Sequence, residues 1–159
     1  MTLIKHSPYH HKFVALGAQL VDRIGFAAPL VFTTTEEEHL ATRNAVGIFD
    51  VYYQVALEVT GRDAEDFLQA SLVSDVSKQN VGQAVYASVC NEAGGMIDDL
   101  TCFRIAKHHF WLFPTPSRVT ALLDVLRARG AAMNVSVTNL GYKNAFISIQ
   151  GPRDRKSVV

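Results

Sequence analysis

Two strand-like segments joined by a turn constrain the fold of this chain more than any other feature. AVYASVCN at 84–91 is apolar and contains β-branched residues, and MIDDLTCFRI at 96–105 continues in the same way. Glu92-Ala93-Gly94-Gly95 lies between them, and glycine adopts the positive φ angles that tight turns need. The two segments are therefore predicted to form an antiparallel hairpin.

Further strand-like and helix-like segments alternate on both sides of this hairpin. The segment 51–60 alternates and is rich in β-branched and aromatic residues, whereas the helix-like segments carry apolar residues on one face. The predicted strands are 51–60, 84–91, 96–105, 110–113 and 133–140, and the predicted helices are 64–72 and 118–130, the second capped by Ser117. The order β-α-β-β-β-α-β is a ferredoxin-like plan with one additional strand. The predicted class is α+β, an antiparallel sheet with two helices on one face.

The segments outside this unit point to a second part of the molecule. Residues 1–50 and 143–159 do not fit the alternation, and we expect them to belong to a first, β-rich domain into which residues 51–142 are inserted. The last residues, RDRKSVV at 153–159, have the pattern of a helix that has only begun. This ending predicts a fragment of a longer protein.

Local signals predict the elements of that first domain. A helix is expected at 10–24, where apolar residues share one face. A second helix is expected after Thr33-Thr34-Thr35, because threonine caps helices and the following Glu36-Glu37-Glu38 favours the positive helix end. Gly47 is expected to close this helix, and a strand is expected at 144–151.

Composition excludes several classes of protein. The chain has 159 residues, of which 48% are hydrophobic and 19% charged, which indicates a folded chain. Fifteen basic and fifteen acidic residues give a net charge of zero, which argues against binding to nucleic-acid phosphates. No apolar run approaches the roughly 18 residues that span a membrane, and the start lacks a signal-peptide core. A cytoplasmic protein is expected, or one of the mitochondrial matrix if the source is eukaryotic.

Cysteine and histidine do not predict a metal site. Cys90 and Cys102 are not in a CxxC spacing and are expected to be reduced core thiols, although a disulfide would follow if their strands paired closely. The histidines include two adjacent pairs, His10-His11 and His108-His109. Neighbours on a strand point to opposite faces, so neither pair is well placed to chelate one ion.

Two adjacent aspartates are the most unusual side chains of the hairpin. Asp98 and Asp99 lie within an apolar strand, and successive strand residues face opposite sides. One interpretation is structural: both are solvated near the strand start or paired with Arg104 or Lys107. The other is a carboxylate aimed at a ligand nitrogen, with Tyr86 near enough across the hairpin to line the same cavity. The residues alone leave both interpretations open.

Several blocks in a fixed order resemble one known family. They are SPYHHKFVALGAQLVD at 7–22, EEHLATRNAVGIFDV at 37–51, VTGRDAEDFLQ at 59–69, SDVSKQNVGQAVYA at 74–87, NEAGGMIDDLTCFRI at 91–105 and NAFISIQGP at 144–152. The combination of EH-x3-R-x3-GIFDV with GG-x2-DDL is specific. On these blocks the chain resembles the N-terminal part of the glycine cleavage T-protein family, the tetrahydrofolate-dependent aminomethyltransferases.

The resemblance implies a fold, a cofactor and a reaction. The complete protein would be about twice this size and have three domains, with tetrahydrofolate in a central channel. Asp98 matches the first aspartate of the family's pair and is implied to orient and activate the folate nitrogen. That nitrogen takes up a methylene from an aminomethyl group on a lipoyl carrier protein, so that ammonia leaves and methylenetetrahydrofolate forms. Tyr86 matches a tyrosine that lines the folate pocket.

Some positions depart from the family pattern, and the resemblance places all of them at the pocket. Tyr52-Tyr53-Gln54 replaces a segment that contributes to the folate site, so Tyr53 is a candidate pocket residue. Thr115 stands where an asparagine is usual, and Phe103 stands where a tyrosine is usual. Gly25-Phe26 replaces Gly-Trp. These changes leave the one-carbon donor open.

Three alternatives to the aminomethyltransferase therefore remain. A folate-dependent demethylase of an N-methyl, O-methyl or sulfonium compound would share the fold and differ at such positions. A non-catalytic folate-binding protein of iron–sulfur maintenance would also share the fold. The chain by itself would also be inactive if half of the folate channel does not suffice for binding.

Overall fold

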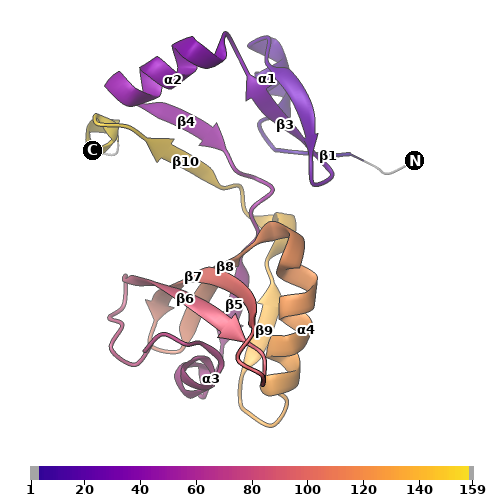
Figure 1. Cartoon of the computed structure of the whole chain (residues 1–159), viewed down its shortest axis with the longest axis vertical. Helices are drawn as coiled ribbons and strands as arrows, with labels where there is room; N and C mark the ends of the chain where they lie inside the picture. Colours follow the sequence, from indigo (N-terminus) through magenta and orange to yellow (C-terminus); the bar gives the residue numbers. More distant parts are fainter. Residues whose placement is uncertain (1–3, 158–159) are drawn as a thin grey trace. The chain divides into compact units, whose positions relative to one another are not determined.

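The computed structural model describes residues 4–157 and divides the chain into two compact units (Figure 1). Unit 1 combines residues 1–53 with 144–159, and unit 2 comprises 54–143. Whether these units are the domains of a longer protein stays a prediction. Within the described residues, no helix is both long and apolar enough to cross a membrane.

Unit 2 is a five-stranded antiparallel sheet with the strand order β6-β7-β8-β5-β9. The strands are β5 (Leu57–Thr60), β6 (Ala84–Cys90), β7 (Met96–Ala106), β8 (His109–Pro114) and β9 (Ser136–Asn139), and the helices are α3 (Ala64–Ser71) and α4 (Val119–Arg129). The predicted ferredoxin-like α+β class is confirmed. The additional strand, β8, lies in the middle of the sheet between β7 and β5.

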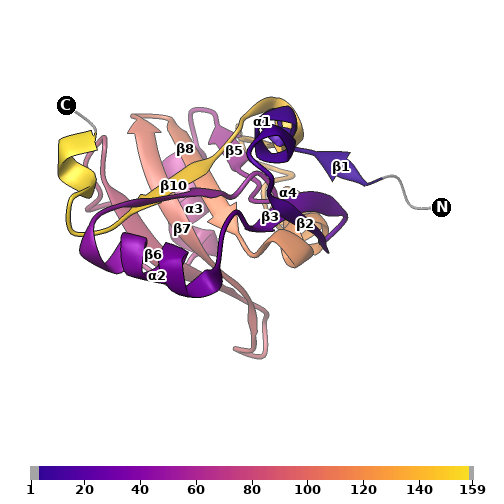
Figure 2. The same ribbon diagram turned by 90° about the horizontal axis from the view of Figure 1, so that it is seen from above.

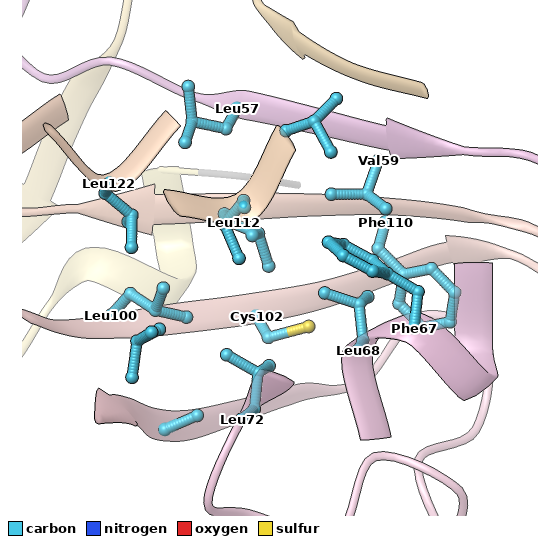
Figure 3. Close-up of a cluster of buried hydrophobic side chains, with 14 of the residues drawn as sticks. Leu57, Val59, Phe67, Leu68, Leu72, Leu100, Cys102, Phe110, Leu112 and Leu122 are labelled. Atoms are coloured by element: carbon cyan, nitrogen blue, oxygen red, sulfur yellow. The ribbon is translucent and has the colours of Figure 1, made fainter. Parts of the chain in front are cut away.

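The core of unit 2 lies between one face of this sheet and the two helices (Figure 3). Alternation along each strand directs every second side chain to the helices, as Leu57 and Val59 of β5 show. Phe67 of α3 and Leu126 of α4 are almost completely buried against the sheet. Each such side chain stabilises the fold by about 1.5–3 kcal/mol, because its apolar surface leaves water.

The turn of the β6–β7 hairpin is held by one side chain. Asn91 Oδ1 accepts hydrogen bonds from the backbone N–H groups of Ala93, at 3.1 Å, and Gly95, at 2.8 Å. Gly94 has φ +79°, the left-handed conformation predicted from the double glycine. The predicted hairpin is therefore confirmed, and a bulge between Val89 and Cys90 interrupts its register.

Unit 1 contains two small sheets. The first has the order β1-β3-β2, and β10 pairs antiparallel with β4 in the second (Figure 2). The strands are β1 (Lys5–His6), β2 (Gln19–Arg23), β3 (Phe26–Val31), β4 (Gly47–Asp50) and β10 (Ile147–Gln150), and the α-helices are α1 (His10–Ala15) and α2 (Thr35–Asn44). Short 3-10 turns are η1 (Pro116–Arg118), η2 (Gly141–Lys143) and η3 (Asp154–Ser157). Of these, η3 lies in the segment expected to begin a helix, whose last two residues are outside the described part.

The predicted helix at 10–24 is wrong beyond its first turns. α1 ends at Ala15, and Gly17 reverses the chain with φ +76°. Residues 19–23 then form β2, in which Leu20 and Val21 pair with β3. The apolar positions that suggested a helix are satisfied in a strand because ladder hydrogen bonds with β3 outweigh local helical spacing.

Two further boundaries differ from expectation. The strand predicted at 51–60 begins only at Leu57, and the Tyr52 backbone N–H instead donates to Asp50 Oδ1 at 3.3 Å in a turn. Ser117 does not cap α4 but lies within η1, so the α-helix starts at Val119. By contrast, the predicted cap of α2 is confirmed, because Thr34 Oγ1 accepts from the Glu37 N–H at 3.2 Å.

Candidate functional site

The sheet of unit 2 has a second face that carries neither of its two helices. Side chains that alternate with the core residues point to this face, which we call the helix-free face. Its residues include Glu58, Tyr86, Asp99, Thr101, Phe103, His109, Trp111 and Phe113. These eight come from four neighbouring strands, so a rigid sheet fixes their spacing.

Asp98 does not belong to the helix-free face. Its side chain lies on the same side of β7 as Leu100 and Cys102, and the residue is 4% exposed. Asp98 Oδ2 accepts a hydrogen bond from the Thr115 backbone N–H at 3.0 Å. A buried carboxylate needs such a donor, and this one ties β7 to the residue that follows β8. The interpretation in which both aspartates are solvated or paired with Arg104 therefore does not hold for Asp98, because Asp98 is buried and Arg104 pairs with Glu65.

Asp99 points to the helix-free face and is the partner of Tyr86. The Tyr86 hydroxyl donates a hydrogen bond to Asp99 Oδ2. The two residues are diagonal neighbours, since Tyr86 is opposite Thr101 and Asp99 is opposite Ser88. Tyr86 is 65% exposed, so the carboxylate–phenol pair is accessible from solvent.

This pairing affects the protonation of the phenol. The hydrogen bond to Asp99 raises the pKa of Tyr86, and loss of water and the negative charges of Asp99 and Asp98 act in the same direction. A phenolate beside a carboxylate is disfavoured, so Tyr86 stays a neutral donor across the physiological pH range. The pair therefore presents one negative charge and an oriented hydroxyl.

Three aromatic rings form a continuous surface beside this pair, which we call the aromatic row. Phe103 of β7 meets Phe113 of β8 edge to face, with ring centres 5.4 Å apart. The ring centres of Trp111 and Phe113 are 6.4 Å apart, and Trp111 is directly opposite Phe103 in the β7–β8 pairing. Such rings provide an apolar surface on which a planar ligand can stack.

Within unit 2, the predicted site residues lie on two different sides of the sheet. Tyr86 and Phe103 share the helix-free face, whereas Asp98 is joined to Thr115 on the helix side. Thr115 also accepts from the Arg118 N–H at 2.9 Å and so begins η1. Tyr53 belongs to unit 1, where the Arg23 guanidinium lies 4.8 Å from its ring centre.

Trp111 was not identified from the sequence as a site candidate. Of the aspartate pair, the resemblance selected Asp98 and not Asp99. The signal was present for Trp111 and Asp99, because counting alternate positions from the apolar core residues assigns each to the face opposite the helices.

Neither a metal cluster nor a cavity found among residues 4–157 coincides with the predicted site residues. Among residues 4–157, no group of three His, Cys, Asp or Glu side chains is arranged to hold an ion. A cavity of about 660 Å³ in unit 1 is lined by apolar residues such as Phe13 and Phe49. A second, of about 490 Å³, lies in unit 2 beside Cys90 and Arg129. None of the predicted site residues lines either cavity.

Known proteins match nearly the whole chain. The family described as the GCVT N-terminal domain matches residues 9–158. An aminomethyltransferase of Corynebacterium jeikeium (strain K411) is 35% identical over 159 residues, which are 100% of this chain and 41% of that protein. An aminomethyltransferase of Staphylococcus epidermidis is 33% identical over 154 residues, 97% of this chain and 42% of that protein.

A solved structure agrees with these matches. The glycine cleavage system aminomethyltransferase T from Bartonella henselae superposes with a TM-score of 0.89 at 28% identity, over 96% of this chain and 42% of that one. The ferredoxin-like unit and the sequence matches together define a member of the GCVT N-terminal domain family. The chain thus belongs to the glycine cleavage T-protein family, and it spans about two fifths of the length of the relatives it matches.

Proposed function

We propose that this chain is the N-terminal part of a tetrahydrofolate-dependent aminomethyltransferase of the glycine cleavage type. The observation that carries the proposal is the match of residues 9–158 to the family, together with relatives that bear this activity in their names. The remaining three fifths of such a protein would supply the rest of the active site. A cytoplasmic location fits the bacterial relatives.

The helix-free face suits a folate in its chemistry. A reduced pterin is planar and carries ring nitrogens, and the aromatic row offers a stacking surface beside the Asp99 carboxylate. Tetrahydrofolate, when bound, supplies the nitrogen that takes up the one-carbon unit. Asp99 would accept a hydrogen bond from that nitrogen and offset the positive charge that develops there, while Tyr86 holds the carboxylate in place.

The geometry therefore favours Asp99 over Asp98 for the reacting carboxylate. The sequence resemblance implies this role for Asp98 instead. The experiment below distinguishes the two assignments. Asp98 is buried and engaged with Thr115, whereas Asp99 shares its face with Tyr86, Phe103 and the other aromatic rings. In this arrangement Asp98 is a positioning residue that holds the end of β8.

The one-carbon donor is proposed to be an aminomethyl group on a lipoyl carrier protein. This follows from the named activity of the relatives. No observation favours a demethylase or a protein of iron–sulfur maintenance over it, although Phe103 and Thr115 depart from the family pattern.

Calorimetric titration of this chain with tetrahydrofolate tests the proposal. Asp99→Asn should weaken binding about tenfold, because a hydrogen bond to a charged group is lost. Asp98→Asn should leave the affinity within about twofold and lower stability instead, since the Thr115 N–H loses its charged acceptor. Glu92→Gln removes a carboxylate from the exposed hairpin turn and serves as the matched control.

Two results would change this account. Weaker binding in Asp98→Asn alone would return the catalytic role to Asp98. Absence of binding by the unaltered chain would show that residues 1–159 do not bind folate without the rest of the protein.

A further inference from the structure

A polar cluster lies on the helix-free face at the opposite end of the aromatic row from Asp99. Glu58 of β5 is directly opposite Trp111 of β8, and His109 lies two residues before Trp111 on the same strand. His109 Nε2 is 2.9 Å from Glu58 Oε1 and 3.1 Å from Trp111 Nε1. About 30% of each acidic and imidazole side chain is exposed, 28% for Glu58 and 31% for His109.

His109 Nε2 thus has two partners, and they require it to be in opposite protonation states. The indole Nε1–H is only a donor, so Nε2 must be unprotonated to accept from Trp111. The Glu58 carboxylate is only an acceptor, so Nε2 must carry a proton to donate to it. A single Nε2 cannot satisfy both partners at the same time.

We propose that His109 is a positioning residue whose protonation exchanges Trp111 for Glu58 as the partner of Nε2, and thereby makes the aromatic row responsive to pH. With neutral His109 in the Nδ1–H tautomer, Nε2 accepts from the indole N–H and fixes the Trp111 ring. With protonated His109, Nε2–H donates to Glu58, and Trp111 loses its acceptor. Imidazole side chains change charge between about pH 5 and 8, so the exchange falls in a physiological range.

Glu58 is the charged group of unit 2 that contacts His109 in the described structure. Among the described residues of unit 2, the titratable groups of the helix-free face and the adjoining turn are Glu58 from β5, Tyr86 from β6, Asp99 from β7, and Lys107 and His108 from the β7–β8 turn. Of these described groups, Glu58 is the one whose side chain contacts the imidazole. β9 contributes Ser136 and Thr138, which carry no charge.

The exchange at His109 is coupled to the proposed ligand surface through the contacts between neighbouring aromatic rings. His109 meets Trp111 edge to face at 6.3 Å, Trp111 meets Phe113 at 6.4 Å, and Phe113 meets Phe103 at 5.4 Å. Release of the indole loosens the first ring of this row. The consequence for ligand affinity rests on the proposed folate function, but the exchange itself does not.

Tryptophan fluorescence measures the exchange directly, because Trp111 is the single tryptophan of the chain. The unaltered protein should show one sigmoidal change in emission between about pH 5 and 8, since a cationic imidazolium beside an indole quenches it. His109→Gln should abolish the change, because glutamine does not titrate.

His108→Gln is the matched control, because it removes the imidazole next to His109 in the sequence, whereas His109 is the one that contacts Trp111. Its profile should match that of the unaltered protein. A flat profile in the unaltered protein, or a transition that persists in His109→Gln, would overturn the proposal. Circular dichroism at each pH ensures that only folded protein is compared.

Ligand binding provides the second readout. The affinity for a reduced folate should fall about fivefold from high to low pH in the unaltered chain, and this ratio should approach one in His109→Gln. Equal pH dependence in both proteins would show that the exchange does not reach the ligand. If neither binds folate while fluorescence still responds, the proposed function fails and the exchange at His109 stands.

Discussion

Two adjacent aspartates of β7 differ in role because their surroundings differ. Asp98 and Asp99 have the same chemistry, but one is 4% exposed and holds a backbone N–H while the other meets an exposed phenol. Removing the acceptor of a buried donor costs about 1–3 kcal/mol, whereas a carboxylate that faces solvent can serve a ligand. The same contrast applies to the two cysteines.

Burial makes Cys102 unreactive, and this gives a prediction at the level of single thiols. Loss of water on burial raises the pKa of Cys102 to about 12, and the side chain is 0% exposed. The thiolate is the reactive species, so an alkylating reagent at pH 8 should modify only the half-buried Cys90 in the folded protein. Mass spectrometry of peptides after brief labelling measures both sites.

Denaturant provides the control for this experiment. Cys102 should be labelled as fast as Cys90 once the chain is unfolded, because both thiols then have ordinary pKa values. The sign for stability follows: above about pH 9 the unfolded state loses the Cys102 proton first, so the free energy of unfolding falls as pH rises. Labelling of Cys102 in the folded state would contradict its burial.

At the level of elements, the turn between β5 and α3 depends on a glycine. Gly61 has φ +132°, and a Cβ there would lie 2.2 Å from the backbone oxygen of Asn134. Gly61→Ala should lower the free energy of unfolding by about 2–3 kcal/mol, because both strain and a backbone clash are introduced. Urea unfolding followed by Trp111 fluorescence reports on unit 2.

Gly82→Ala separates the two causes. Gly82 also has positive φ, +84°, but a Cβ at this residue would have no atom within 4 Å. Its cost should be that of the backbone conformation alone, about 1 kcal/mol. Equal costs at both positions would show that the Asn134 contact is not what requires glycine at Gly61.

Elements with strong local signals were predicted well from the sequence. The β6–β7 hairpin has its double glycine, and α2 has Thr34 followed by glutamates, so caps and turn residues agreed with the final fold. The helix predicted at 10–24 was wrong beyond Ala15 because residues 19–23 pair with β3, which is a non-local contact. The strand predicted at 51–60 was wrong before Leu57 because a local turn at Asp50 outweighed its β-branched composition.

The site was predicted less completely than the fold. The sequence identified the aspartate pair and Tyr86, but the phase of β7 decides which aspartate faces Tyr86. That phase depends on the pairing of whole strands, which single-residue patterns do not contain. The His109 cluster gave no signal at all, because Glu58 lies far from it in the sequence.

For the whole molecule, the buried apolar residues are distributed very unequally. The large core cluster lies entirely in unit 2, whereas the buried apolar residues described in unit 1 are Phe26, Ala28 and Tyr52. Backbone amides of the β4–β10 pair should therefore exchange with solvent at least about tenfold faster than those of the β7–β8 pair. Hydrogen exchange followed by mass spectrometry measures both strand pairs in one sample.

Phe67→Ala tests the origin of this difference. It removes a core side chain of unit 2 at a cost of about 3–5 kcal/mol and should speed exchange in β7 and β8 while leaving β4 and β10 nearly unchanged. Uniform exchange across both units before substitution would show that the chain opens as one cooperative body.

Positions 98 and 99 are both aspartate, so a comparison of sequences does not reveal which of the two faces the core of unit 2. A shift of one residue in the register between β6 and β7 would exchange the two carboxylates between core and surface. The sequence of the strand would be unchanged. An engineer who transplants this hairpin must therefore copy the bulge between Val89 and Cys90 with it. The bulge fixes the register of β7 against β6. It therefore determines which aspartate lies beside Tyr86.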